Sequence, residues 1–212
     1  MATSEIIEMV PCNSVYELSP KFIKIHHEIL RREFKFSTKN IKKPVFIMYE
    51  SPAFDPESIL VLYKERKSYK LELLQFDNSL WNQMHDQIDK IKTNKYRSKQ
   101  IKVSYSLSRK SKAINSETAT TIKKAVDLVF KKARKPTEEE TNSSKKYLDG
   151  TVFIFESNAG ACGMVLEGYE GRPKILLDIA LLLKQYIKSD EFSQADIDKQ
   201  IINLASAVKN IL

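Results

Sequence analysis

Three strand-like segments follow one another early in the chain, with no helix-length segment between them. They are residues 44–50 (PVFIMYE), 59–65 (ILVLYKE) and 69–76 (YKLELLQF), which are rich in β-branched and aromatic residues. The last two lie close enough for a hairpin that turns near Arg66-Lys67-Ser68. Because successive strands break the strict strand–helix alternation of a doubly wound parallel sheet, we expect a mostly antiparallel sheet.

Further strands are predicted on the C-terminal side of these three. The clearest pattern is in residues 101–108 (IKVSYSLS), where Ile101, Val103, Tyr105 and Leu107 face one way and the polar residues face the other. Residues 151–156 (TVFIFE) are apolar on both faces, and the turn-forming residues 158–160 lead into a strand near residues 162–167.

Helical spacing of apolar residues predicts five helices. The first covers about residues 19–35 and starts at Ser19-Pro20, and the second could be capped by Asn78 and reaches Ile91. The third runs from Asn115 or Ser116 to Pro136, and the fourth follows Pro173. The last runs from a Ser193–Asp196 capping box to Ile211. The predicted fold is therefore α+β: a mostly antiparallel sheet of about six strands with four to five packed helices. We expect one domain over residues 1–212, with residues 135–148 as the only plausible internal boundary.

A run without acidic residues is the strongest functional feature. Between residues 90 and 116 every charged side chain is basic: Lys90, Lys92, Lys95, Arg97, Lys99, Lys102, Arg109, Lys110 and Lys112. The net charge of the whole chain is +8, so this run holds all of the positive excess. Three interpretations remain open: a solvated surface beside an edge strand, where lysines discourage aggregation; a site for an acidic protein or an anionic membrane surface; or a nucleic-acid site.

The residues predicted to bind a partner come from this basic run. They are Lys92, Lys95, Tyr96, Arg97, Lys99, Lys102, Arg109 and Lys110. Lysine outnumbers arginine, whereas arginine is the side chain that reads bases by paired hydrogen bonds. Nucleic acid is therefore the less favoured of the two partner classes.

No catalytic, cofactor-binding or metal-binding residue is predicted. The P-loop and GxSxG patterns do not occur, and Arg31 stands where an HExxH motif starting at His27 needs its second histidine. His26 and His27 are adjacent and diverge by about 100° on a helix, so they cannot easily share a metal. Cys12 and Cys162 form no CxxC pair. We expect two independent small apolar side chains, with a disulfide or a reactive thiol as the alternative.

All five glycines fall between residues 150 and 171. Tight turns and backbone recognition of a ligand both use glycine, and turns are the expected use. Residues 147–187 resemble a strand–turn–strand–helix module of uncharacterised bacterial α+β proteins. The resemblance is carried by Leu148-Asp149-Gly150-Thr151-x-Phe153-x-Phe155, a glycine turn, a second strand and a helix of pattern LLxIxxLLxxY. The chain departs from that module after Gly163, where Met164-Val165 replaces a tryptophan-proline element. The resemblance implies a core strand after the turn and carries no activity.

No segment reaches the roughly 20 apolar residues of a transmembrane helix, and residues 1–12 lack the basic and apolar regions of a secretory signal. We expect a cytoplasmic protein, with an exported origin open if the N-terminus has been trimmed. The leading functional hypothesis is a non-enzymatic binding protein, such as a toxin-neutralising immunity protein or another accessory factor. The alternatives are a nucleic-acid-binding protein that uses residues 90–112, and an enzyme whose site is assembled from distant residues, for example Cys162 with His26, His27 or His85.

Overall fold

The structure is a computed structural model that describes residues 8–14, 21–37, 41, 44–52, 55–88, 98–135, 151–166 and 169–210. Its centre is a seven-stranded antiparallel sheet of order β1-β7-β6-β2-β3-β4-β5. The strands are β1 (Val10–Pro11), β2 (Pro44–Ser51), β3 (Ser58–Glu65), β4 (Ser68–Phe76), β5 (Leu107–Ile114), β6 (Val152–Ser157) and β7 (Cys162–Leu166). The α+β prediction is confirmed, although the sheet has seven strands where about six were expected.

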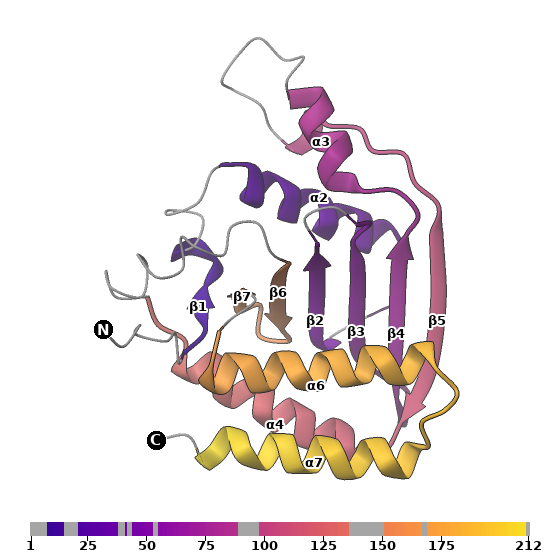
Figure 1. Cartoon of the computed structure of the whole chain (residues 1–212), viewed down its shortest axis with the longest axis vertical. Helices are drawn as coiled ribbons and strands as arrows, with labels where there is room; N and C mark the ends of the chain where they lie inside the picture. The colour runs from indigo at the N-terminus through magenta and orange to yellow at the C-terminus, as the bar shows by residue number, and fades with distance from the viewer. Residues whose placement is uncertain are drawn as a thin grey trace.

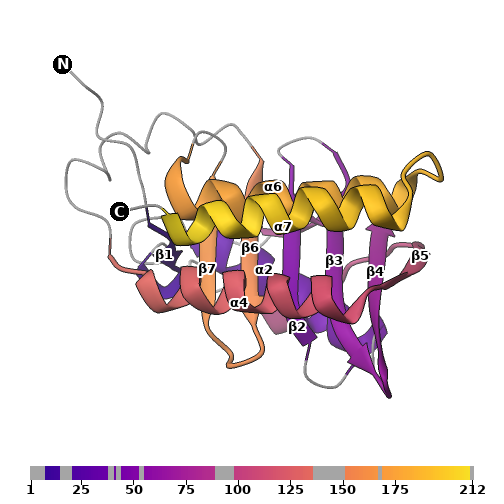
Figure 2. The same ribbon diagram turned by 90° about the horizontal axis from the view of Figure 1, so that it is seen from below.

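Helices cover both faces of the sheet. The helices are α2 (Lys21–Ser37), α3 (Leu80–Ile88), the 3₁₀ helix η1 (Ser98–Gln100), α4 (Ser116–Lys132), α6 (Gly171–Lys188) and α7 (Gln194–Asn210). Helices α4, α6 and α7 lie together on one face, whereas α2 lies on the other with α3 beyond it (Figures 1 and 2). None of the helices in the described ranges combines the length and apolarity that crossing a lipid bilayer needs.

Each central strand divides its side chains between two apolar cores. In β2, Phe46 and Met48 join the core under α4, α6 and α7, while Ile47 and Tyr49 join the core under α2 and α3. Successive side chains of a strand point to opposite faces, and in β2 all five residues from 45 to 49 are buried. Strands β2, β3 and β6 are therefore apolar on both faces because helices cover both.

Several predicted local features are confirmed. The β3–β4 hairpin turns at Arg66-Lys67, with Arg66 at a φ of 56°. The Asn115 side chain accepts a hydrogen bond from Glu117 N at the start of α4, and Ser193 Oγ accepts one from Asp196 N at the start of α7. Both contacts satisfy backbone N–H groups that a helix leaves without partners at its N-terminus.

The prediction that Asn78 caps α3 is wrong. The helix begins at Leu80, and the hydroxyl of Ser79 accepts a hydrogen bond from Asn82 N. The carboxylate of Glu57, from the segment before β3, accepts from the first two N–H groups of the helix, Leu80 N and Trp81 N, both at 2.8 Å. A distant acidic side chain therefore does much of the capping that a local asparagine was expected to do. Ile91, Ser19-Pro20, Pro136 and Ile211 lie outside the described residues.

The predicted strand over residues 101–108 is also wrong in its bounds. The alternation itself is present, since Lys102, Ser104 and Ser106 are exposed while Ile101 is buried. Only from Leu107 onward does the chain pair with β4, and that strand continues to Ile114. Residues 101–106 are extended beside α3 instead, and side chains take the place of the neighbouring strand.

Candidate functional site

The described part of the basic run, from residue 98 onward, forms one border of the molecule. We call residues 98–114, which comprise η1, the extended segment and β5, the basic edge. In Figure 1 this chain leaves the region of α2 and α3, descends along the outer side of β4 and becomes β5, the last strand of the sheet. The basic edge contains Lys99, Lys102, Arg109, Lys110 and Lys112 and no acidic residue.

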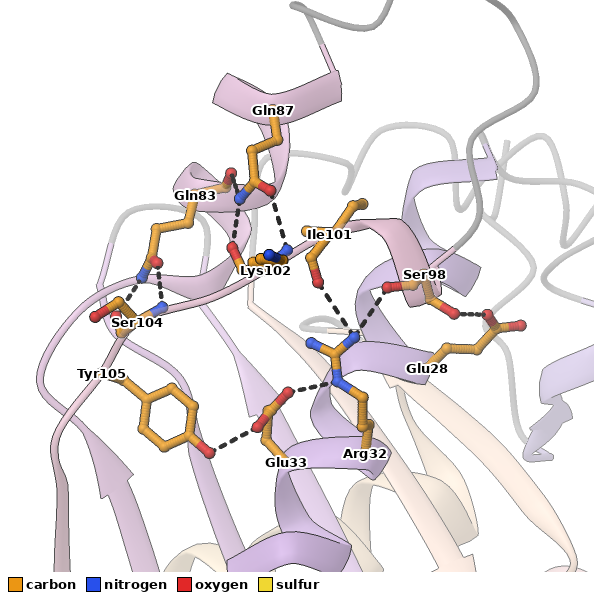
Figure 3. A network of polar contacts seen from close by, with 10 residues as sticks. All are labelled: Glu28, Arg32, Glu33, Gln83, Gln87, Ser98, Ile101, Lys102, Ser104 and Tyr105. Atoms are coloured by element: carbon orange, nitrogen blue, oxygen red, sulfur yellow. Dashed lines mark hydrogen bonds and ion pairs between the residues drawn. The ribbon is translucent and has the colours of Figure 1, made fainter.

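Two glutamines of α3 hold the extended segment by its backbone (Figure 3). The Gln83 amide donates to Ser104 O at 3.0 Å and accepts from Ser104 N at 2.8 Å. The Gln87 amide makes the same paired contact with Lys102 O and Lys102 N, at 2.5 and 3.0 Å. Residues four apart on a helix share a face, and residues two apart in an extended chain share an edge. Two side-chain amides therefore imitate a neighbouring strand.

Helix α2 anchors the same segment from below. The Arg32 guanidinium donates to Ser98 O at 2.9 Å and to Ile101 O at 3.2 Å (Figure 3). The Tyr105 hydroxyl donates to Glu33 Oε2 at 2.7 Å. These contacts fix the backbone and the inward side chains, and they leave the lysine side chains of the segment exposed.

The structure separates the predicted partner-binding residues into three groups. Lys92, Lys95, Tyr96 and Arg97 lie outside the described residues. Lys99 and Lys102 are exposed on the anchored segment. Arg109 and Lys110 are neighbours on β5, so their side chains point to opposite faces of the sheet.

The cations of β5 already have partners in the fold. Arg109 Nη1 lies 3.2 Å from Glu72 Oε1 on β4. On the other face, Lys110 Nζ lies 3.5 Å from Lys188 O, and Lys112 Nζ donates to Ser189 O at 2.8 Å. These two carbonyls end α6, where a positive charge is favourable for the helix dipole. Lys112 also lies 2.9 Å from Asp190 and lowers the pKa of that carboxyl through its hydrogen bond and charge.

A buried polar cluster lies between α2 and the sheet, and its first half is centred on Glu57, which is fully buried. Glu57 Oε1 lies 2.8 Å from His26 Nε2, and His26 Nδ1 lies 3.3 Å from the Ser51 hydroxyl. Burial alone raises the pKa of Glu57, but the His26 hydrogen bond and charge and the N–H of Leu80 outweigh it and lower the pKa. Glu57 is thus an anion that anchors α3. Ser51, His26 and Glu57 lie in a row, as the groups of a catalytic triad do. The contacts of Glu57 with the N-terminus of α3 nevertheless favour a structural role over nucleophilic catalysis.

The second half of the cluster surrounds Glu156 of β6. Its Oε1 lies 3.1 Å from His27 Nε2 and 2.8 Å from Arg31 Nε. Burial lowers the pKa of His27 and outweighs the opposing effect of Glu156, so the imidazole is neutral at pH 7. The adjacent histidines therefore contact different carboxylates: His26 contacts Glu57 and His27 contacts Glu156.

The expectation that the two cysteines are independent is wrong. Cys12 and Cys162 form a disulfide with a Cα–Cα distance of 5.4 Å. The antiparallel pairing of β1 with β7 explains this, because Val10 lies opposite Met164 and Pro11 opposite Gly163, so Cys12, which follows Pro11, comes beside Cys162, which precedes Gly163. A Cβ at Gly163 would lie 2.1 Å from the sulfur of Met9, so this glycine permits a close approach. Gly160, with a φ of 78°, forms the expected turn.

The disulfide lies beside the second half of the polar cluster. The two Sγ atoms and a ring nitrogen of His27 all lie within 4.8 Å of one another. Of the three histidines named with Cys162 in the sequence-based enzyme hypothesis, the structure thus brings His27 to it. Nothing in the local sequence around any of these residues signals the cluster, because they come from the residue after β1, from α2 and from β7.

Comparison of the chain with protein-family models, with curated proteins and with solved structures finds no match. The functional argument therefore rests on the geometry of the basic edge and of the polar cluster.

Proposed function

We propose that this protein is a binding protein that docks an acidic, extended segment of a protein partner along the basic edge. The observation that carries the proposal is the position of β5. It is the last strand in the sheet order and pairs only with β4 among the described residues. An exposed sheet edge can accept a further strand through backbone hydrogen bonds, and the basic side chains supply charge complementarity to an acidic strand.

Anchoring of the edge supports the proposal. Five residues of β5 are exposed: Ser108, Arg109, Lys110, Ser111 and Ala113. The segment before β5 is held by Gln83, Gln87 and Arg32. A binding surface whose backbone is already fixed loses less conformational entropy when a partner binds. The basic edge is therefore preorganised for docking.

A purely protective role is the main competitor. Lysines on an edge strand discourage unwanted strand pairing, and the contacts of Arg109, Lys110 and Lys112 stabilise the fold itself. The two explanations differ in one respect: a protective edge binds no strand, whereas a docking edge binds an acidic one and rejects a basic one.

The test uses defined probes. A fluorescent peptide of alternating Glu and Val, its Lys and Val counterpart, and a single-stranded oligothymidylate are titrated with the protein at low and physiological salt, with anisotropy as the readout. We expect the acidic peptide alone to bind, with an affinity that falls as salt rises. The variant K99E/K102E/R109E/K110E should weaken this binding at least about tenfold. The matched control K124E/K131E/K132E/K209E reverses four charges on α4 and α7 and should retain it.

Other outcomes overturn the proposal. Binding of the oligonucleotide in place of the peptide, lost in the edge variant and kept in the control, would assign the edge to nucleic acid. Equal loss in both charge-reversed variants would mean that net charge and not the edge is responsible. No binding of either anionic probe at low salt would leave the protective role.

A cytoplasmic location is part of this proposal, as is an accessory or immunity-type role. The disulfide is the observation that bears on location, because stable disulfides are rare in reducing compartments. In a cytoplasmic protein Cys12 and Cys162 would be reduced for much of the time. Fractionation of cells that express the protein, with thiol alkylation before lysis, tests both points. A protein recovered outside the cytoplasm and fully oxidised would contradict the location.

A further inference from the structure

A second cluster with its own chemistry lies at the opposite border of the sheet from the basic edge. Cys12 follows β1, Cys162 begins β7, and His27 belongs to α2. The two sulfurs and a ring nitrogen of His27 lie within 4.8 Å of one another. Cys12 and His27 are 3 % and 2 % exposed, whereas Cys162 is half-buried. Three segments far apart in sequence thus converge on a largely buried site.

The donor set is specific. Two thiolates and an imidazole are ligands that Zn²⁺ and other borderline-soft divalent cations favour over Mg²⁺ or Ca²⁺. With three protein ligands, a tetrahedral ion keeps a fourth position for water. The spacing of the three atoms needs only a local adjustment to place each about 2.0–2.3 Å from one ion.

The charges around the cluster permit a cation. Glu156 lies opposite Cys162 in the pairing of β6 with β7, and its carboxylate contacts both His27 and Arg31. The positive charge of Arg31 is therefore balanced by Glu156, while two thiolates would balance the charge of a divalent ion. Carboxylates next to ligating histidines commonly orient the ring in zinc sites.

We propose that reduction of the Cys12–Cys162 disulfide converts this cluster into a binding site for a Zn²⁺-type cation, with Cys12, Cys162 and His27 as ligands. A dithiol reductant transfers two electrons and two protons to the disulfide and is itself oxidised to a disulfide. The cation then displaces the two thiol protons. Oxidation reverses the sequence and releases the ion. The site does not depend on the docking function of the basic edge.

The experiment uses Co²⁺ as a spectroscopic probe. The full chain is reduced with dithiothreitol, freed of reductant under anaerobic conditions, and titrated with CoCl₂. We expect one Co²⁺ per chain, with thiolate-to-cobalt charge-transfer and tetrahedral d–d absorption that Zn²⁺ abolishes by displacement. The oxidised protein should show neither band. Absence of these bands in the reduced protein would overturn the proposal.

Variants identify the ligands. His27→Gln should lower the affinity of the reduced protein for Co²⁺ at least about tenfold, and C12S/C162S should abolish the charge-transfer band. His85→Gln, on α3, is the matched control and should bind as the wild type does. Equal affinity in His27→Gln and the wild type would remove the imidazole from the site.

If reduction of the disulfide destabilises the fold, the thermal unfolding temperature of the reduced protein, measured with and without Zn²⁺, still tests the proposal. A ligand that binds only the native state raises Tm or restores folding by mass action. Zn²⁺ should therefore stabilise the reduced wild type and His85→Gln, and should stabilise reduced His27→Gln clearly less. Equal stabilisation of all three would show that the folded protein binds Zn²⁺ without the His27 imidazole and would contradict the proposal.

Discussion

The two faces of the sheet hold their helices by different chemistry. Under α4, α6 and α7 the contact with the strands is an apolar core that includes Phe46, Phe155 and Leu183. Under α2 and α3 the apolar core is interrupted by buried titratable groups, among them His26, His27, Glu33, Glu57 and Glu72. The first face is stabilised mainly by apolar burial, which depends little on pH. The α2 face also depends on buried charge pairs, in which removal of one partner leaves the other buried without a compensating charge.

This difference suggests which face can respond to conditions. Acid, reduction and cations act on groups of the α2 side, where the disulfide and both carboxylate–histidine contacts lie. Among the described residues the α6 side has no histidine or cysteine between its helices and the strands, although it has an ion pair between Lys184 of α6 and Glu50 of β2. The experiments that follow test this contrast.

The largest effect is expected from Glu57→Ala on the α2 side. The change leaves a buried imidazole and the N–H groups of Leu80 and Trp81 without their acceptor, and it should cost about 4 kcal/mol of unfolding free energy. Urea denaturation at pH 7 measures the loss. Glu57→Gln, which keeps the shape and one acceptor, should recover part of it. A loss below about 1 kcal/mol for the alanine variant would show that the anchoring is not important.

On the apolar face, Leu183→Ala should cost about 3 kcal/mol, because Leu183 is fully buried on α6. The informative quantity is how each loss varies with pH. The lowered pKa of Glu57 means that its stabilising contribution is complete above about pH 4.5 and is lost as pH falls through the folded-state pKa. The Glu57→Ala deficit should therefore shrink in acid, while the Leu183→Ala deficit should stay constant. Parallel behaviour of the two variants would break the contrast between the faces.

Smaller losses are expected where α3 holds the basic edge. Gln83→Ala and Gln87→Ala each remove two hydrogen bonds to backbone groups that water can reach, so each should cost about 1 kcal/mol. Hydrogen exchange should speed up at Ser104 N in the first variant and at Lys102 N in the second. Asn82→Ala, on the same helix, should leave both amides unchanged. Unchanged protection in the glutamine variants would mean that the pairing in Figure 3 is not what holds the segment.

The smallest effect at neutral pH concerns His27. Its pKa is lowered by burial from an ordinary value of 6.5, so the unfolded chain binds the extra proton first as pH falls. Stability should be complete above pH 6.5 and should decline below it, by at most about 1.4 kcal/mol per pH unit, until the folded-state pKa is reached. His27→Gln should remove this decline. A wild-type stability that is flat from pH 7 to pH 5 would contradict the assigned protonation.

Sequence patterns predicted what depends on neighbours along the chain. The β3–β4 hairpin, the α4 cap at Asn115 and the α7 cap at Ser193 follow from local residue types and were predicted correctly. The class of fold also follows, because the order of strands and helices limits the topologies that can form.

The remainder required contacts between distant segments. Glu57 caps a helix that starts 23 residues later, and nothing local distinguishes it from a surface glutamate. The alternation of residues 101–108 was correctly recognised as an extended chain, but alternation cannot show whether a strand or two glutamines will pair with it. The spacing of Gln83 and Gln87 was the one available signal. The disulfide depended on the pairing of β1 with β7, across a sequence separation of 150.

The order of the strands has a consequence for synthesis on the ribosome. After the short strand β1, strands β2 to β5 emerge and can pair in sequence, which leaves β2 temporarily at the border of a four-stranded sheet. Its final neighbour, β6, begins about 100 residues after β2 ends, a delay of roughly 5 to 20 s at ordinary elongation rates. During that interval an apolar strand of the nascent chain has an open edge, so the protein is expected to need a chaperone, or slow dilution during refolding, before the second half of its sheet is made.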